Sequence, residues 1–192
     1  MRIVLLGPPG GGKGTQAAIL KKDWHIPHVS TGELLRAACR NKTPLGQKVQ
    51  AVMDAGELVS DDLMLELLED RFAADDVEDG FILDGYPRNL AQAGALDGLL
   101  QRIGQPLDAA LLIEVDEQNI LDRIAQRARE EGRSDDSAEV VRNRLQVYAE
   151  HTAPVADHYV EDGRLIRVLG EGEIEVITER ILSAIKAADW IG

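Results

Sequence analysis

The sequence is poor in cysteine and contains no long apolar run. Its one cysteine, Cys39, rules out an internal disulfide framework and a zinc site built from several cysteines. We expect Cys39 to be a small apolar residue buried in a helix. No apolar run approaches the length that spans a bilayer, and the start of the chain lacks the basic segment and apolar core of a signal peptide. These absences favour a cytoplasmic protein with no membrane partner.

Basic residues are also scarce. The chain has 21 Lys and Arg against 34 Asp and Glu, a net charge of -13. Such a surface repels nucleic acid and anionic membranes, so we predict neither as a partner, and a phosphate ligand must be held by a local positive cluster. With 192 residues, 44% of them hydrophobic, the chain suits one domain with small insertions and a real core.

A glycine-rich stretch gives the most specific signal. It lies between an apolar run, residues 3–6, and a helix-forming run, residues 16–22. Gly7-Pro8-Pro9-Gly10-Gly11-Gly12-Lys13 matches the P-loop pattern, although Gly14 stands at the usual hydroxyl position and the hydroxyl follows at Thr15. Glycine N–H groups, the helix dipole and the Lys13 charge all favour a phosphate. A tight turn that binds nothing is the alternative, and the position between strand and helix argues against it.

Strand-like and helix-like segments alternate along the chain, which predicts an α/β fold with a parallel sheet covered on both faces. We expect helix caps at Ser30 or Thr31, at Thr43, at residues 60–62 and at Asn89. The expected strands are residues 3–6, a short piece within 24–29, 80–84, 109–115 and 165–169. The expected helices are 16–22, 31–40, 44–56, 63–73, 90–102, 120–128, 140–151, one after Pro154, and 174–187.

Asp84 ends one of the predicted buried strands and resembles the Walker-B acid that holds Mg²⁺ or its waters near a P-loop. The alternative is a carboxylate that caps the next turn. The P-loop upstream favours the metal role. The four histidines show no metal-ligand spacing, so we interpret them as core or surface residues.

Arginines cluster within one helix–loop–helix segment of this acidic chain. Arg123 and Arg127 are four residues apart and share a helix face. The segment 129–137 is polar without an apolar period, which predicts an exposed loop whose Asp135 and Asp136 orient the arginines. A solvated charged face is the alternative; the P-loop favours phosphate contacts, because guanidinium groups bind phosphate oxygens in bidentate fashion. The cluster comprises Arg123, Arg127, Arg129, Arg133, Arg142 and Arg144.

Taken together, several segments resemble the adenylate kinase family, in its bacterial form with a short lid. The similarity covers essentially the whole chain in the family's order and spacing, and Lys13-Gly14-Thr15 is the family's own form of the P-loop. The matching segments are residues 7–16, 30–36, 56–59, 80–88, 122–127 and 132–136.

The resemblance implies a three-layer P-loop NTPase fold with a five-stranded parallel sheet and two insertions. Residues 1–29, 60–125 and 137–192 would form the core, 30–59 the nucleoside-monophosphate-binding domain and 126–136 the lid. It also implies a monomer that transfers a phosphoryl group from MgATP to AMP and gives two ADP. The short lid lacks the cysteines of zinc-bearing relatives, so no structural zinc is expected.

The resemblance also implies roles for single residues. Arg123 would stack on the ATP adenine and Arg127 would bind the ATP phosphates, while Asp84 would hold Mg²⁺ through water. Arg36 and Arg88 would bind the AMP phosphate and Gln92 its base. For ATP the set is Gly10, Gly11, Gly12, Lys13, Gly14, Thr15, Arg123, Arg127 and Gly172, with Gly170 the alternative to Gly172. For AMP it is Thr31, Arg36, Glu57, Leu58, Val59, Gly85, Tyr86, Pro87, Arg88, Gln92, Arg133 and Arg144. The catalytic set is Lys13, Arg88, Arg123, Arg133 and Arg144.

Two other functions stay open at this point. UMP/CMP kinases share the chemistry, but relatives of that kind tend to carry Ala where Thr31 stands, so Thr31 and Gln92 favour AMP. A non-catalytic nucleotide-sensing module could use the same fold, but it could dispense with Asp84, Arg88 or the lid arginines, all of which are present.

Overall fold

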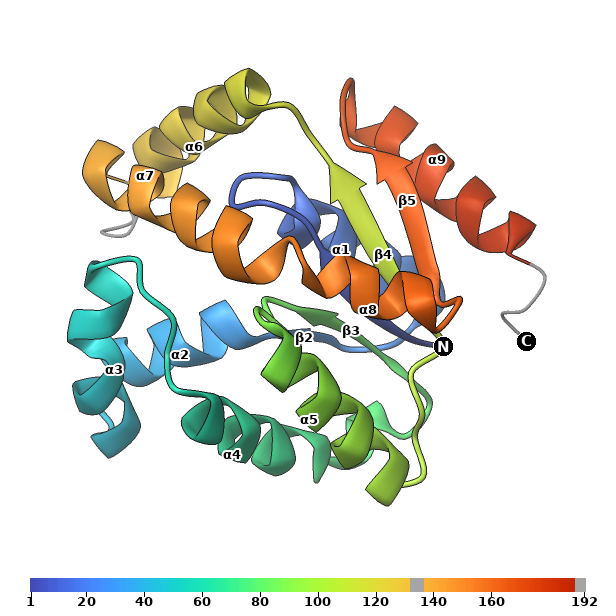
Figure 1. Cartoon of the computed structure of the whole chain (residues 1–192), viewed down its shortest axis with the longest axis horizontal. Helices are drawn as coiled ribbons and strands as arrows, with labels where there is room; N and C mark the ends of the chain where they lie inside the picture. The colour runs from blue at the N-terminus through green and yellow to red at the C-terminus, as the bar shows by residue number, and fades with distance from the viewer. Residues whose placement is uncertain (132–136, 189–192) are drawn as a thin grey trace.

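The computed structural model describes residues 1–131 and 137–188. Its centre is a five-stranded sheet in the order β2-β3-β1-β4-β5 (Figure 1). Every neighbouring pair of strands is parallel, as the alternation of strands and helices predicts. The strands are β1 (Arg2–Leu6), β2 (His28–Ser30), β3 (Phe81–Asp84), β4 (Ala109–Glu114) and β5 (Leu165–Leu169).

Helices connect the strands. Three helices carry the expected caps: the oxygens of Ser30, Thr43 and Asn89 accept backbone N–H bonds at 3.4, 3.1 and 2.8 Å. The helices are α1 (Lys13–Trp24), α2 (Thr31–Arg40), α3 (Pro44–Asp54), α4 (Asp61–Phe72), the 3₁₀ turn η1 (Asp75–Val77), α5 (Leu90–Arg102), α6 (Glu117–Glu131), α7 (Ala138–Val147), the π-helical turn η3 (Tyr148–Thr152), α8 (Val155–Glu161) and α9 (Ile174–Ala187).

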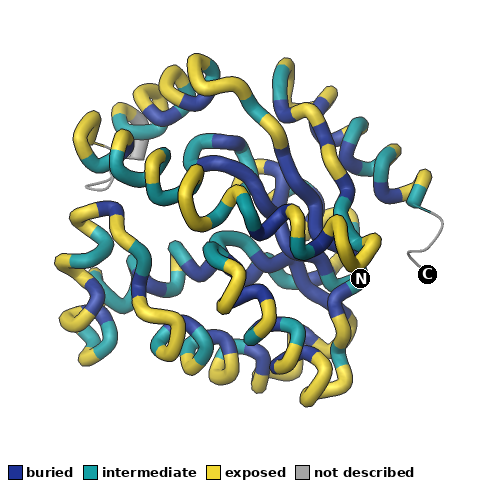
Figure 2. The backbone as a smooth tube through the Cα atoms, viewed as in Figure 1, coloured by how far each residue is buried: buried dark blue, intermediate teal, exposed yellow. Residues whose placement is uncertain are grey.

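The sheet has a hydrophobic core on each face. Along β1, Ile3 and Leu5 pack with α1 and α9, whereas Val4 and Leu6 pack with α4, α5 and α8. The alternation follows from the period of two in a strand. Figure 2 shows the strands buried at the centre and the outer turns of the helices exposed. The fold is therefore the predicted three-layer P-loop NTPase architecture.

Two helix pairs project from these layers. A small separate cluster of Ile120, Ile124 and Val141 joins α6 to α7, and α2 packs against α3. Both pairs lie on the side of the molecule opposite α9 (Figure 1). No helix among the described residues is long and apolar enough to cross a membrane.

Three local predictions need correction. Residues 129–131, predicted as loop, are the last turn of α6, because Arg and Glu favour helix even without an apolar pattern. The oxygen of Ser60 makes no capping hydrogen bond to α4. Cys39 is in α2 as predicted but only partly buried, and its Sγ lies 3.5 Å from the Gly46 carbonyl oxygen. Of the rest of the predicted loop, 132–136 lies outside the described residues, and Ser137 precedes α7 and caps it.

Gly80 precedes β3 in a conformation that only glycine adopts readily. Its φ is +135°, and a Cβ there would lie 2.1 Å from the Met1 carbonyl oxygen. We expect Gly80→Ala to lower the free energy of unfolding by about 3 kcal/mol, measured by urea titration. The matched control is Gly98→Ala in α5, where a Cβ meets nothing within 4 Å. The control should raise the free energy of unfolding by about 0.5 to 1 kcal/mol, and equal effects of the two changes would contradict this interpretation.

Candidate functional site

Strand register brings the predicted site residues to one edge of the sheet. Asp84 is paired with Leu5 on one side and with Ser30 on the other, so the P-loop, the start of α2 and the turn after β3 leave the sheet side by side. Ligands of parallel α/β sheets bind beyond these carboxyl ends. A cavity of about 1220 Å³ opens there.

The P-loop crosses the end of β4 at close range. A Cβ on Gly7 would lie 2.6 Å from the Ile113 carbonyl oxygen, so a larger residue would push the loop off the sheet. α1 begins at Lys13, three residues before the predicted start. The Lys13 Nζ donates to the carbonyl oxygens of Gly7 and Pro8 at 2.7 and 2.9 Å. The lysine thus holds together the loop whose residues line the cavity.

Burial makes the ammonium of Lys13 easier to deprotonate. Burial lowers the pKa of Lys13 to about 8; Asp84 opposes this change, and Arg88, Arg144 and Arg127 add to it. A bound phosphate would supply the missing negative charge and favour the protonated lysine. More basic than acidic residues line the cavity, as an anion-binding site requires, in a chain whose net charge is -13.

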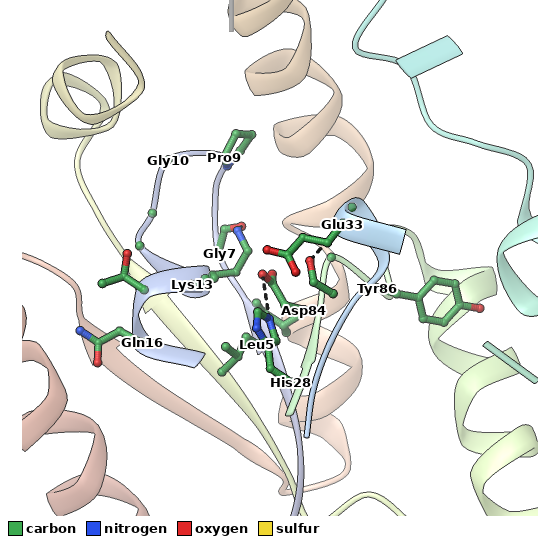
Figure 3. A pocket seen from close by; sticks show the side chains of 18 of the residues that line it. Leu5, Gly7, Pro9, Gly10, Lys13, Gln16, His28, Glu33, Asp84 and Tyr86 are labelled. Atoms are coloured by element: carbon green, nitrogen blue, oxygen red, sulfur yellow. Dashed lines mark hydrogen bonds and ion pairs between the residues drawn. The ribbon is translucent and has the colours of Figure 1, made fainter. Parts of the chain in front are cut away.

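Asp84 lies between His28 and the P-loop (Figure 3). Burial by itself raises the pKa of this carboxyl, but His28, Lys13 and Arg88 outweigh burial and hold the pKa below its usual range. The His28 Nε2 is 3.6 Å from Asp84 Oδ2, which is an electrostatic contact too long for a hydrogen bond. A Cβ on Gly14 would be 3.9 Å from the same carboxylate oxygen, so Asp84 faces the P-loop as an ionised group.

Arg88 follows Asp84 in the turn that leads to α5. Its Nε donates to the Gly85 carbonyl oxygen at 2.7 Å, and its backbone N–H donates to Gln92 Oε1 at 2.8 Å. The Gln92 Nε2 donates to Asp61 Oδ1 at 2.7 Å. Because an ionised carboxylate only accepts hydrogen bonds, Asp61 fixes the orientation of the Gln92 amide. The Arg88 carbonyl oxygen accepts a hydrogen bond from Thr152 Oγ1 at 2.8 Å.

The clustered arginines separate in space. Arg123, Arg127 and Arg144 line the large cavity. Arg142 lines a different cavity, and the Arg129 Nε donates to the Ala125 carbonyl oxygen of its own helix at 3.2 Å. Arg133 lies outside the described residues.

The turn after β5 joins the same site. The Arg123 Nη2 donates to the Gly170 carbonyl oxygen at 2.8 Å. Gly170 packs tightly, since a Cβ there would lie 2.4 Å from Ile113 Cγ2, whereas Gly172 lines the cavity.

Tyr86 belongs to the main core, and its ring points away from Asp84 (Figure 3).

Every predicted site residue within the described part of the chain lines the large cavity or a smaller one of about 60 Å³ beside it. The two cavities share lining residues, among them Arg36, Arg88 and Arg144. Lining the large cavity are Gly10, Gly11, Gly12, Lys13, Gly14, Thr15, Arg36, Leu58, Asp84, Gly85, Tyr86, Pro87, Arg88, Arg123, Arg127, Arg144 and Gly172. Lining the smaller one are Thr31, Arg36, Glu57, Leu58, Val59, Gly85, Arg88, Gln92 and Arg144.

Sequence reasoning missed three residues around this site: His28, Asp61 and Thr152. Asp61 bonds Gln92 from 31 positions away in the chain, and Thr152 bonds Arg88 from 64 positions away. His28 contacts Asp84. Sequence reasoning also missed a cluster outside the site. Asp97, His158 and Asp162 gather their polar atoms within 4.8 Å, and Arg164 bonds both carboxylates, so this cluster is an ion-pair network.

Comparisons with known proteins agree with this geometry. A family model described as adenylate kinase matches residues 5–164. The chain belongs to the adenylate kinase family. Three similar relatives, each named adenylate kinase, come from Stenotrophomonas maltophilia strains R551-3 and K279a and Xanthomonas campestris pv. campestris strain 8004. They are 59%, 58% and 56% identical over 186, 187 and 185 residues, which is 97%, 97% and 96% of this chain and 100%, 100% and 99% of theirs.

Membership in the adenylate kinase family settles the reaction. The chain is an enzyme, a phosphotransferase that transfers a phosphoryl group reversibly between ATP and AMP and gives two ADP. Nothing in the comparisons favours a UMP/CMP kinase or a non-catalytic module.

Proposed function

We propose that the large cavity holds both nucleotides at once, with the ATP phosphates on the P-loop and the AMP phosphate against Arg36 and Arg88. One observation carries this proposal: a single cavity of about 1220 Å³ runs from the P-loop to those arginines. Its volume exceeds the range of about 300–1,000 Å³ usual for one ligand. Two phosphate groups held in one water-poor space can react directly.

No protein nucleophile is needed for this transfer. The AMP phosphate oxygen attacks the γ-phosphorus of ATP in line, so catalysis consists of positioning and charge stabilisation. In the proposal Lys13 follows the transferred group, Arg88 and Arg144 stabilise the charge between the nucleotides, and Arg123 and Arg127 hold ATP. Gly172 contacts the adenine of ATP. Arg133, outside the described residues, stays a member of the proposed set on the resemblance alone.

Enzymes of this family use MgATP, and the site suits the metal. Asp84 is an ionised carboxylate beside the P-loop, the kind of ligand that Mg²⁺ prefers. We propose that Asp84 holds the ion through water. When bound, Mg²⁺ neutralises phosphate charge; the residues of the chain position the nucleotides.

Substrate binding also requires moving parts in this proposal. Residues 30–59 and 126–136 would close over the core formed by 1–29, 60–125 and 137–192. The α2–α3 pair lies within the first of these ranges and is joined by its own packing, and the last residues of α6 lie within the second. Closure would exclude water that otherwise hydrolyses ATP. We further propose that the enzyme is a monomer that binds neither nucleic acid nor membranes.

We expect Gln92 to discriminate among the bases of the acceptor nucleotide. With MgATP as donor, we expect kcat/KM for AMP to exceed that for CMP, UMP and GMP by at least about a hundredfold. Arg88 and Asp61 fix the orientation of the Gln92 amide, so a base that does not match its remaining donor and acceptor positions leaves those positions unpaired. A coupled assay with the four acceptors measures this. A preference for CMP or UMP would show that AMP is not the acceptor. ATP binding with no ADP formed from ATP, Mg²⁺ and AMP would show that the protein does not catalyse the transfer.

A further inference from the structure

A hydrogen bond joins Arg88 to a helix far away in the sequence. The Thr152 Oγ1 donates to the Arg88 carbonyl oxygen at 2.8 Å, across 64 positions of the chain. Thr152 ends the π-helical turn η3 between α7 and α8. Figure 1 shows α7 and α8 as one run of helix that leads from α6 back to the core. Both partners of the bond line the large cavity.

The backbone hydrogen bonding around Thr152 is that of a π turn, and its hydroxyl bonds another segment and not its own helix. A threonine inside a helix commonly bonds the carbonyl oxygen four residues earlier in its own helix. For Thr152 that oxygen belongs to Tyr148, and it accepts the Ala153 N–H at 2.8 Å, five residues on. A π turn holds one extra residue and therefore changes the direction in which the following side chains point. Here the result is a hydroxyl aimed at another segment.

This bond completes a set of three that fix Arg88. The backbone N–H is held by Gln92, the side-chain Nε by the Gly85 carbonyl and the carbonyl oxygen by Thr152. Gly85 lies in the same β3–α5 connection as Arg88, and Gln92 lies in the first turn of α5. Only Thr152 comes from the helix run that also carries Arg144. The bond thus ties Arg88 to the helix run that carries Arg144, and both of these arginines line both cavities.

We propose that Thr152 is a positioning residue for phosphoryl transfer, whose hydroxyl fixes the Arg88 peptide so that the guanidinium stays aimed between the two phosphates. The inference rests on the proposed role of Arg88. If Thr152 only supported the helix, the shape of its side chain would matter and its hydroxyl would not. If the hydroxyl positions Arg88, its removal should have no effect in a protein that lacks the Arg88 guanidinium. These two differences define the experiment.

The test uses Thr152→Val, which keeps the branched shape and removes the hydroxyl, and Thr152→Ser, which keeps the hydroxyl. We expect Thr152→Val to lower kcat about tenfold and to change the Kd for ATP less than twofold, and Thr152→Ser to keep kcat within about twofold of the unchanged enzyme. In an Arg88→Ala background, Thr152→Val should cause no further loss. Thermal melts report folding, and Thr152→Ala replaces the valine variant should that one not fold.

Each contrary result is decisive. The proposal is overturned by near-normal kcat in Thr152→Val beside an impaired Arg88→Ala, by equal losses in the valine and serine variants, or by a further tenfold loss in the Arg88→Ala background. Near-normal activity of Arg88→Ala itself would instead remove the assigned role of Arg88, and the role of Thr152 with it.

Discussion

Replacing Lys13 by Met lowers kcat about a thousandfold, with the AMP affinity unchanged. The expected loss is about 4 kcal/mol, because in the proposed mechanism the ammonium of Lys13 stabilises the charge of the phosphoryl group in transfer. The Lys13 Nζ lies between the carbonyl oxygens of Gly7 and Pro8, a position with room for a compact donor. Steady-state kinetics with saturating MgATP and AMP measure kcat, and isothermal calorimetry measures AMP binding.

The control variant is Lys13→Arg, which keeps the charge. A planar guanidinium does not match the position of a compact ammonium, so we expect this variant to recover less than about a tenth of kcat. Recovery of most of the activity would show that the positive charge alone matters. The hydrogen bonds from Lys13 to the loop carbonyl oxygens would then be unimportant for catalysis. Thermal melts must show both variants folded, since the lysine also holds the loop carbonyls.

The pH dependence of binding gives a second check on Lys13. Its pKa of about 8 lies below the ordinary lysine value, so Lys13 is neutral in roughly nine-tenths of the protein molecules at pH 9. Bound phosphate favours the charged form, so ATP binding at pH 9 should take up nearly one proton, and at pH 7 far less. Calorimetry in buffers of different ionisation enthalpy measures this uptake. Lys13→Met should show none, and equal uptake in both proteins would contradict the assignment.

The fold was predictable where the local sequence carries the information. Strands β1 and β3 are short apolar runs that end beside glycine, so Leu6 and Asp84 could be placed at strand ends and hence at one edge of the sheet. Ser30, Thr43 and Asn89 could be named as caps because the cap is made within a few residues. The resemblance to the family supplied the set of arginines. Their positions around one cavity come from the structure.

The contacts that hold the site residues in place were not predictable in this way. His28 approaches Asp84 because β2 pairs with β3, and Asp61 meets Gln92 because α4 begins beside the first turn of α5. Such contacts depend on strand order and helix packing, which hydrophobic periodicity does not encode. The end of α6 was mispredicted for a different reason. Its last residues are charged helix formers, so a prediction from the pattern of apolar residues alone ends the helix too early.

Replacing Arg88 by Ala should lower kcat by a factor on the order of hundreds, a loss of roughly 3 kcal/mol for one donor to the transferring group. Because the side chain is tied to Gly85 and its backbone to Gln92, its position is set before any nucleotide binds. KM for AMP should rise as well, while the Kd for ATP stays within about twofold.

Two variants separate charge from position in this prediction. Arg88→Lys keeps the charge but not the fork of donors, so we expect less than about a tenth of kcat to return. Arg102→Ala is the matched control, because Arg102 lies at the end of α5 with its side chain paired to the exposed Glu69 and lines neither cavity. We expect it to keep full activity. Loss in Arg102→Ala as large as in Arg88→Ala would mean that any arginine removed from this acidic chain damages the enzyme. A selective loss in Arg88→Ala, with ATP binding intact, would place this guanidinium at the phosphate of the acceptor.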